Sequence, residues 1–198
     1  MFKRFVFGLG TGRCGTLSLA HLLSRQKETY VTHELSGKDL SWTVDADLFK
    51  KYYNTIEGFE HSVVGDVSFV LLPYVPLIMQ KCPTTKFVVL RRDREETIQS
   101  YVEKTAHKGT DIWHTSSTAN SWAKCYPSFE GTTKEENIGL YYDKYYADVE
   151  SYMKRFPESF FLLDTYGLND ESKLMEMLTF CGYSNPSPIK MHRNKGPA

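Results

Sequence analysis

The sequence lacks any long hydrophobic run. Its longest apolar stretch, residues 69–79, contains two prolines and falls well short of the roughly 20 residues that a membrane-spanning helix needs. The apolar run at the N-terminus reaches glycines after only a few residues, which makes a poor signal-peptide core. We therefore expect a protein with neither a membrane span nor a secretion signal.

An excess of charge of one sign is also missing. The chain carries 24 Lys+Arg and 24 Asp+Glu, so its formal net charge is zero. Proteins that bind nucleic acid or anionic membranes usually show a basic field over one face. We therefore expect no nucleic-acid partner, and any anion-binding site has to be local.

Paired or clustered cysteines are absent as well. The four cysteines occur without a CxxC pair or a Cys/His cluster, so the pattern indicates neither a zinc site nor a disulfide framework. This pattern is typical of reduced thiols, and we expect a cytoplasmic protein. The four residues are Cys14, Cys82, Cys125 and Cys181.

What is present is an alternation of short β-rich runs and helical patterns. In 198 residues of 41% hydrophobic content, this pattern predicts a single domain, residues 1–198, of the α/β class. We expect three α/β/α layers around a parallel sheet of about five strands, similar to the P-loop NTPases. The predicted strands are Phe5–Leu9, Thr29–His33, Ser62–Asp66, Lys86–Arg91 and Phe160–Asp164.

Helical periodicity separates these strands, with Asp45 as a capping residue. Residues 107–131 have weak periodicity and many small polar side chains, so we expect a loop or lid there, with His107 and His114 as lid or acceptor groups or as ordinary loop histidines. The predicted helices are Thr16–Gln26, Asp45–Tyr53, Phe69–Gln80, Arg94–Lys104, Glu136–Arg155 and Asn169–Cys181.

The first strand leads through glycines into a helix, an arrangement that gathers main-chain N–H groups at the positive end of the helix dipole. Gly10 and Gly15 have the spacing of a nucleotide-binding loop. Thr16 and Leu17, however, replace the lysine and the hydroxyl residue that nucleoside triphosphate hydrolysis requires. The cation of this loop is instead Arg13, three residues earlier.

Two other interpretations of the loop remain open. A glycine-rich strand-to-helix connection is often only a tight turn, although Arg13 and the hydroxyls of Thr11, Thr16 and Ser18 favour an anion site. Cys14 at the helix N-terminus would suit a low-pKa thiolate nucleophile. Cysteine-dependent phosphatases, however, place the cysteine first and the arginine last in their loop, the reverse of the order here.

A second basic cluster follows the fourth predicted strand. Arg92 lies at its carboxyl end, and Ser100 follows two turns into the next helix. Ligands of parallel sheets bind at this end of the strands, so a guanidinium and a hydroxyl would converge on one anion. The alternative is a surface pair, Arg91 and Arg92, bonded to Glu95 and Glu96.

With both clusters present, the chain resembles the sulfotransferases that use 3′-phosphoadenosine 5′-phosphosulfate (PAPS). That family has a [K/R]-[S/C]-G-T motif after its first strand, here Arg13-Cys14-Gly15-Thr16, and an arginine followed eight residues later by a serine, here Arg92 and Ser100. The stretches "VVGDVS", "FLLDTYGLNDESKLMEMLTFCGY" and "HRNKG" extend the resemblance over most of the chain. Cys14 replaces the commoner serine, and the chain is shorter than most animal members.

The resemblance implies how the donor is held. The loop would bind the 5′-phosphosulfate, Arg92 and Ser100 the 3′-phosphate, and the late residue Arg193 would reach the 3′-phosphate or adenine unless the tail, with Asn194 and Lys195, is frayed. The product would be adenosine 3′,5′-bisphosphate, and no metal is expected because Arg13 supplies the positive charge. The loop residues concerned are Gly10, Thr11, Gly12, Arg13, Cys14, Gly15, Thr16 and Leu17.

A general base is needed to accept the proton of a hydroxyl or amine acceptor. In the protein-tyrosine branch of the family the base is a glutamate about twenty residues after the loop arginine, and Glu34 stands 21 positions after Arg13. The resemblance therefore favours Glu34, with His33 as a second candidate or as the partner of Glu34. Both are alternatively ordinary strand-end residues.

The acceptor itself is not specified by the sequence, and we expect a small molecule, a carbohydrate or a peptide. The tyrosine-rich "YYDKYY" at 141–146 is expected to pack in the core or to line a groove. Two rival functions follow from the same residues: a small P-loop kinase, and a non-catalytic nucleotide-binding protein of sulfotransferase descent.

Overall fold

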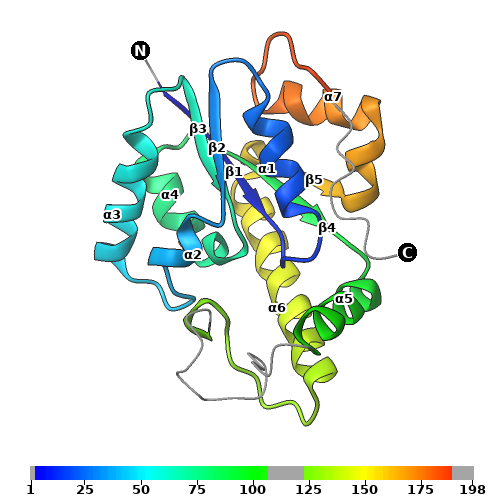
Figure 1. Ribbon diagram of the computed structural model, residues 1–198. Helices are drawn as coiled ribbons and strands as arrows, with labels where there is room; N and C mark the ends of the chain where they lie inside the picture. Colours follow the sequence, from blue (N-terminus) through cyan, green and yellow to red (C-terminus); the bar gives the residue numbers. More distant parts are fainter. Residues whose placement is uncertain (1–2, 107–122, 189–198) are drawn as a thin grey trace.

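The chain folds around one sheet of five parallel strands. A computed structural model describes residues 3–106 and 123–188 (Figure 1). The strand order is β2-β3-β1-β4-β5, which confirms the predicted α/β fold with a central parallel sheet. The strands are β1 (Arg4–Leu9), β2 (Thr29–His33), β3 (Val63–Val67), β4 (Lys86–Arg91) and β5 (Phe160–Asp164).

The strand order reverses at β1, and this reversal decides where a ligand fits. Strands β3 and β2 lie on one side of β1, and β4 and β5 lie on the other. At its carboxyl end β1 pairs Gly8 with Val67 of β3 and Leu9 with Val89 of β4. The loop after β1 therefore lies at the switch point of the sheet, where ligands of open α/β proteins bind.

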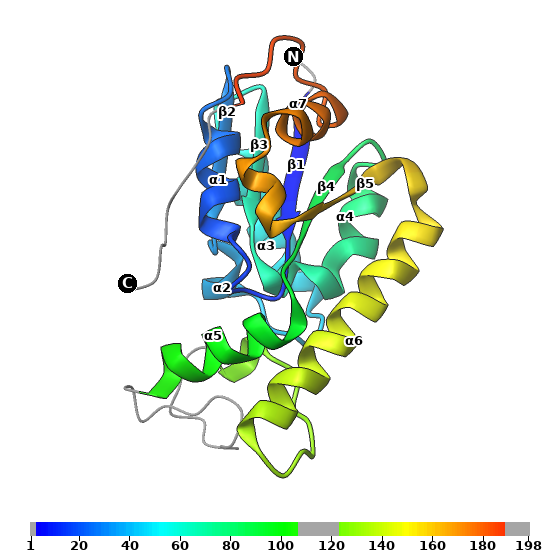
Figure 2. The same ribbon diagram turned by 90° about the vertical axis from the view of Figure 1, so that its right-hand side faces the viewer.

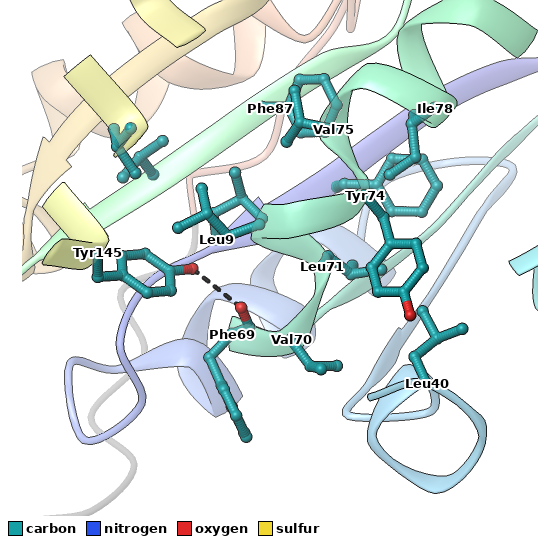
Figure 3. Packing of buried hydrophobic residues seen from close by; sticks show 14 of the residues in the cluster. Leu9, Leu40, Phe69, Val70, Leu71, Tyr74, Val75, Ile78, Phe87 and Tyr145 are labelled. Carbon is teal, nitrogen blue, oxygen red and sulfur yellow. Dashed lines mark hydrogen bonds between the residues drawn. The ribbon is translucent and has the colours of Figure 1, made fainter. Parts of the chain in front are cut away.

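Two helical layers cover the sheet, and β1 alternates between them (Figure 2). Val6 packs on the layer of α1 (Thr16–Ser24) and α7 (Glu171–Phe180), whereas Phe7 and Leu9 belong to the cluster on the other face. That second layer consists of α3 (Ala46–Glu57), α4 (Val75–Lys81) and α6 (Lys134–Arg155). Figure 3 shows this second cluster, with Leu9 of β1 between Tyr145 of α6 and Leu71.

One predicted helix is wrong as a single element, for an identifiable reason. Residues Phe69–Tyr74 form the 3₁₀ helix η1 before α4, because Pro73 lies inside the first segment and Pro76 lies in the first turn of the second. The helix predicted over Asn169–Cys181 is confirmed as α7, which begins two residues later, at Glu171, because the 3₁₀ turn η4 (Thr165–Asn169) precedes it and the Asp170 side chain caps its first turn. The predicted cap at Asp45 is confirmed, and α3 continues to Glu57.

Several short elements gather near the carboxyl edge of the sheet. The long helix there is α5 (Arg94–Ala106), which packs along α6 (Figure 1). The sequence did not predict α2 (Ser36–Asp39), the 3₁₀ turns η2 (Ala123–Cys125) and η3 (Pro157–Ser159), or the first two residues of α6, Lys134 and Glu135. His107 and His114, with most of the expected lid, lie outside the described residues.

Among the helices of residues 3–106 and 123–188, none has the length and apolar composition of a membrane span.

Candidate anion-binding and catalytic site

The loop between β1 and α1 has an unusual main-chain conformation. Gly12 and Gly15 have φ of 84° and 96°, and Arg13 between them has φ of 57°. Left-handed φ is uncommon for an arginine and costs free energy, so the surroundings must impose it. Within residues 3–106 and 123–188, Arg13, Glu28 and Glu34 are the non-glycine residues with positive φ, and two of the three are candidate catalytic residues.

The surroundings hold the loop by its carbonyl groups. The Thr11 carbonyl accepts hydrogen bonds from the hydroxyls of Tyr101 and Tyr141. The Gly12 carbonyl accepts one from the Thr11 hydroxyl at 3.1 Å. Two further side chains then bind the next two carbonyls: the Arg92 Nη1 bonds that of Arg13 at 3.1 Å, and the Thr165 hydroxyl bonds that of Cys14 at 2.8 Å.

This anchoring leaves the loop suited to an anion. Four consecutive carbonyl oxygens, which would repel a phosphate, are occupied by donors, and in a trans peptide the N–H points away from the carbonyl of the same plane. The first main-chain bond of α1 runs from the Leu19 N–H to the Gly15 carbonyl, and Gly15 has no side chain to cap the N–H groups of Thr16 and Leu17. The helix terminus therefore offers donors and a positive dipole.

Not every residue of the predicted loop reaches a ligand. The Gly10 N–H donates to the Tyr145 hydroxyl at 2.9 Å, and the Thr11 side chain is fully buried, so both shape the loop from beneath. Thr16 is nearly buried, with its hydroxyl 3.1 Å from His33 Nε2. Arg13, by contrast, is exposed.

Cys14 does not fit the thiolate-nucleophile alternative. Its side chain is fully buried in the cluster beneath α1, and burial raises the pKa of the thiol to about 11, although the Gly12 main chain and the Thr11 side chain act in the opposite direction. A thiol of this kind is almost fully protonated at neutral pH and has no access to a substrate.

We therefore expect Cys14 to be unreactive in the folded protein. Iodoacetamide at neutral pH should modify the half-buried Cys82 first and leave Cys14 intact, as mass spectrometry of the peptides would show. Cys14→Ala should keep its transfer rate within a few-fold of that of the unaltered protein. Complete loss of transfer in this variant would support the alternative in which Cys14 is a catalytic nucleophile.

The second basic cluster lies beside the first, because β4 is the neighbour of β1. Arg13 Nε donates to the Ser100 hydroxyl at 3.1 Å, and Arg92 reaches the Arg13 carbonyl. Arg92 Nε also donates to the Glu96 carboxylate at 2.9 Å, and the Tyr166 hydroxyl donates to the other oxygen of Glu96 at 2.6 Å. The two clusters thus form one basic site, and Glu96 orients the Arg92 guanidinium.

Part of the surface-pair interpretation also holds. The Arg92–Glu96 contact is the expected pair, with the two side chains 31% and 40% exposed, and such pairs contribute little stability. Arg91 points elsewhere, toward Glu150 and the face of the Tyr146 ring. Arg92 is therefore the arginine of this pair that faces the loop.

Glu34 lies just past β2, at the same edge of the sheet. Its N–H donates to the Val67 carbonyl at 3.0 Å, and its φ is 56°. Burial is the main cause that raises the pKa of Glu34, and the Asp66 carboxylate raises it further. The Arg13 guanidinium lowers it, so the carboxylate and the loop cation lie close enough to interact.

Asp66 is the buried carboxylate that fixes the chain after Glu34. Its two oxygens accept hydrogen bonds from the N–H groups of Leu35 and Ser36, at 3.2 and 2.9 Å, and from the hydroxyls of Thr32 and Tyr52. The sequence pattern did not indicate this role for Asp66. A lone carboxylate within an apolar strand was the available signal.

His33 contacts α1. Its Nε2 contacts the Thr16 hydroxyl, and its ring lines a hollow of about 230 Å³ between α1 and β2, together with His21 and Arg25. Burial is the main cause that lowers the pKa of His33. The Arg13 guanidinium therefore acts on the Glu34 carboxylate, whereas His33 contacts the start of α1.

The remaining sequence predictions concern tyrosines and the C-terminus. The hydroxyls of the "YYDKYY" motif bond to the main chain of both basic clusters, a role that the sequence alone did not indicate. Arg193, Asn194 and Lys195 lie outside the described residues. All four cysteines are free thiols, and the described part of the chain has no group of three His, Cys, Asp or Glu placed to hold a metal ion.

The fold and the site define an α/β protein with a glycine-rich strand-to-helix loop at the switch point of a parallel sheet. A family model described as a sulfotransferase domain matches residues 5–166. The chain belongs to the sulfotransferase family.

Solved structures agree with this fold. A sulfotransferase from Alicyclobacillus acidocaldarius superposes with a TM-score of 0.64 at 16% identity, over 98% of this chain and 88% of that one. A sulfotransferase domain from the curacin biosynthetic pathway gives a TM-score of 0.52 at 13% identity, over 99% and 81% of the two chains. Among curated proteins, none matches this chain.

Proposed function

We propose that the protein transfers a sulfuryl group from PAPS to a hydroxyl or amine acceptor. One arrangement carries the proposal: the exposed Arg13 donates to the hydroxyl of Ser100 in the second basic cluster and is near enough to the partly buried Glu34 carboxylate to lower its pKa. A cation between an anion-binding loop and a base is what a displacement at sulfur requires.

The donor would lie across the carboxyl ends of β1 and β4. The N–H groups at the start of α1 and the Arg13 side chain suit the phosphosulfate, because helix N-termini and cations bind anionic groups. Arg92 and Ser100 suit a second phosphate, the 3′-phosphate, because a guanidinium and a hydroxyl both donate to phosphate oxygens. Arg13 contacts both residues of the second cluster, Ser100 through its side chain and Arg92 through its carbonyl, so the two clusters are adjacent. One molecule with two anionic groups therefore fits both.

The chemical step follows from these positions. The acceptor oxygen or nitrogen forms a bond to sulfur while the bond from sulfur to the 5′-phosphate oxygen breaks, and the Glu34 carboxylate takes the acceptor proton. Arg13 stabilises the charge that develops on the leaving phosphate. Adenosine 3′,5′-bisphosphate and the sulfated acceptor are the products.

Aromatic side chains near Glu34 bear on the acceptor. Burial is the main cause that raises the pKa of Tyr126, and the nearby Glu34 carboxylate raises it further. The Tyr126 ring stacks on Phe69 at 4.5 Å between centroids, and the half-buried Trp42 meets Tyr141 edge-on at 5.9 Å. These aromatic side chains suit an acceptor that is a ring-bearing small molecule, a carbohydrate or a tyrosyl peptide.

The free thiols agree with the reducing cytoplasm as the compartment of the protein.

The test is a transfer assay with ³⁵S-labelled PAPS against phenolic, carbohydrate, lipid and tyrosyl acceptors. We expect label to move to at least one class without added ATP. Calorimetry should show adenosine 3′,5′-bisphosphate binding much more tightly than ATP. Equal binding of the two, or magnesium-dependent release of phosphate from ATP, would contradict the proposal and favour a kinase.

Arg92→Ala tests the second anion site separately. It removes the guanidinium proposed for the 3′-phosphate, so the preference for adenosine 3′,5′-bisphosphate over adenosine 5′-monophosphate should fall by about 10- to 100-fold, the usual worth of a hydrogen bond to a charged group. Arg91→Ala is the adjacent control for lost positive charge, because that guanidinium contacts Glu150, Tyr142 and Tyr146 and not the loop. An equal fall in both variants would show a general loss of positive charge instead.

A further inference from the structure

Four tyrosines of α6 form two rows on one side of the helix. Tyr141 and Tyr145 are four residues apart, and so are Tyr142 and Tyr146, so the members of each pair lie on successive turns of the helix, with ring centroids 5.7 and 4.6 Å apart. All four side chains are at most 5% exposed. Their rings pack in the core, but a buried hydroxyl also needs a hydrogen-bond partner, and the partners of these four follow a pattern.

The first row bonds to the loop after β1. The Tyr141 hydroxyl donates to the Thr11 carbonyl at 3.0 Å, and the Tyr145 hydroxyl accepts from the Gly10 N–H at 2.9 Å. Tyr145 also donates to the Phe69 carbonyl at 3.3 Å, the contact drawn in Figure 3, and so ties the loop to the segment after β3. Both main-chain groups of the loop lie directly before the left-handed Gly12 and Arg13.

The second row bonds to the end of β4. The Tyr146 hydroxyl donates to the Leu90 carbonyl at 2.7 Å, and the Tyr142 hydroxyl donates to the Arg92 carbonyl, also at 2.7 Å. These two carbonyls flank Arg91: that of Leu90 belongs to β4, and that of Arg92 to the turn directly after it. Each row therefore serves one strand end, and one rigid helix carries both rows.

We propose that the four tyrosine hydroxyls of α6 are positioning groups that hold the two anion-binding strand ends at a fixed spacing. This inference rests on the proposed function, because the spacing matters for a ligand that carries two anionic groups at a fixed distance. Phenylalanine would fill the same core and would lack the bond to the main chain. The hydroxyls thus link core packing to nucleotide recognition.

The two rows predict different defects. Tyr145→Phe leaves the Gly10 N–H without its acceptor and loosens the loop, so it should weaken adenosine 5′-monophosphate and adenosine 3′,5′-bisphosphate alike, by about three- to tenfold, the worth of one buried hydrogen bond. Tyr142→Phe releases the Arg92 carbonyl, so it should weaken the bisphosphate by a similar factor and leave the monophosphate unchanged. Tyr141→Phe and Tyr146→Phe are the second members of each row and should behave likewise, with a smaller effect at Tyr141 because Tyr101 still holds the Thr11 carbonyl.

Tyr74→Phe is the matched control. Its side chain is fully buried in the same core and donates to the Ser41 carbonyl at 2.9 Å, away from both strand ends (Figure 3). It should lower the thermal midpoint as the α6 variants do and leave both dissociation constants unchanged. Calorimetric titration of the folded variants with the two nucleotides, beside thermal unfolding, measures all these quantities.

The outcomes separate the two proposals. If the unaltered protein binds neither nucleotide, the proposed function fails and this inference fails with it. If it binds the bisphosphate well but Tyr145→Phe and Tyr142→Phe behave like Tyr74→Phe, the tyrosines only pack the core and this inference alone is overturned. Should either of these two variants not fold, its row partner, Tyr141→Phe or Tyr146→Phe, decides the same question.

Discussion

Glu34→Gln is expected to lower the rate of transfer by about 10²- to 10⁴-fold, the usual contribution of a general base. Glutamine keeps the shape of the side chain and its left-handed main chain but does not accept a proton. Donor binding should change little. Single-turnover measurement at saturating PAPS, with calorimetry of adenosine 3′,5′-bisphosphate, would separate the two effects.

His33→Gln is the comparison for this variant. His33 bonds to Thr16 and faces the hollow between α1 and β2, so its replacement should lower the rate of transfer much less than Glu34→Gln does. If His33→Gln abolishes transfer and Glu34→Gln does not, the two roles have to be exchanged.

The pH dependence of the reaction should report Glu34. Burial and Asp66 raise the pKa of Glu34 above its usual value of 4.5, and the base works only when ionised. As pH falls through this raised pKa, kcat/KM is lost, so its acid limb should lie above pH 4.5 and should be absent in Glu34→Gln. An acid limb that persists unchanged in the variant would assign the titration to another group.

The raised pKa of Glu34 also makes the stability of the fold depend on pH. The folded protein binds the Glu34 proton more tightly than the unfolded chain, so the ionised carboxylate destabilises the fold above this pKa, and stability rises as pH falls through it. At neutral pH, Glu34→Gln should therefore lose activity while its thermal midpoint is equal or higher. That combination distinguishes lost chemistry from misfolding.

Arg13→Ala is expected to reduce the single-turnover rate by about 10²- to 10³-fold, the usual cost of removing a group that stabilises transition-state charge. The charge on the leaving phosphate appears only as the bond breaks, so the loss should fall on the rate at saturating donor and less on KM for PAPS. Arg13→Lys keeps the charge without the guanidinium that reaches Ser100 and should recover part of the rate.

The main chain of the loop provides the control for Arg13. The Arg13 carbonyl is held by Arg92, a contact that does not depend on the Arg13 side chain, so the left-handed conformation should persist in both variants. A rise in KM at unchanged single-turnover rate would show that Arg13 only binds the donor. Loss of binding to both nucleotides together with a lower thermal midpoint would show that the variant disturbs the loop itself.

The local pattern of the sequence determined the strands and the place of the site. Period-two and buried runs of β-branched and aromatic residues predicted all five strands to within a residue at each end, and the glycines around Arg13 predicted the loop that follows β1. These features depend on neighbouring residues. The single helix predicted over Phe69–Gln80 was wrong, because residues Phe69–Tyr74, with Pro73, form a 3₁₀ helix before α4. The hydrophobic pattern does not distinguish this packed 3₁₀ segment from an α-helix.

Only the tertiary structure decided how the site is held and which way its side chains face. The Gly10–Tyr145 and Arg92–Tyr142 bonds join residues 135 and 50 positions apart, and they exist because α6 docks across the ends of β1 and β4. The turn that follows Glu34 is likewise fixed by Asp66, a residue of another strand. Hydrogen-bond geometry between distant segments follows from packing, so the sequence predicted the cation and the anion loop, and the fold alone supplied what positions them.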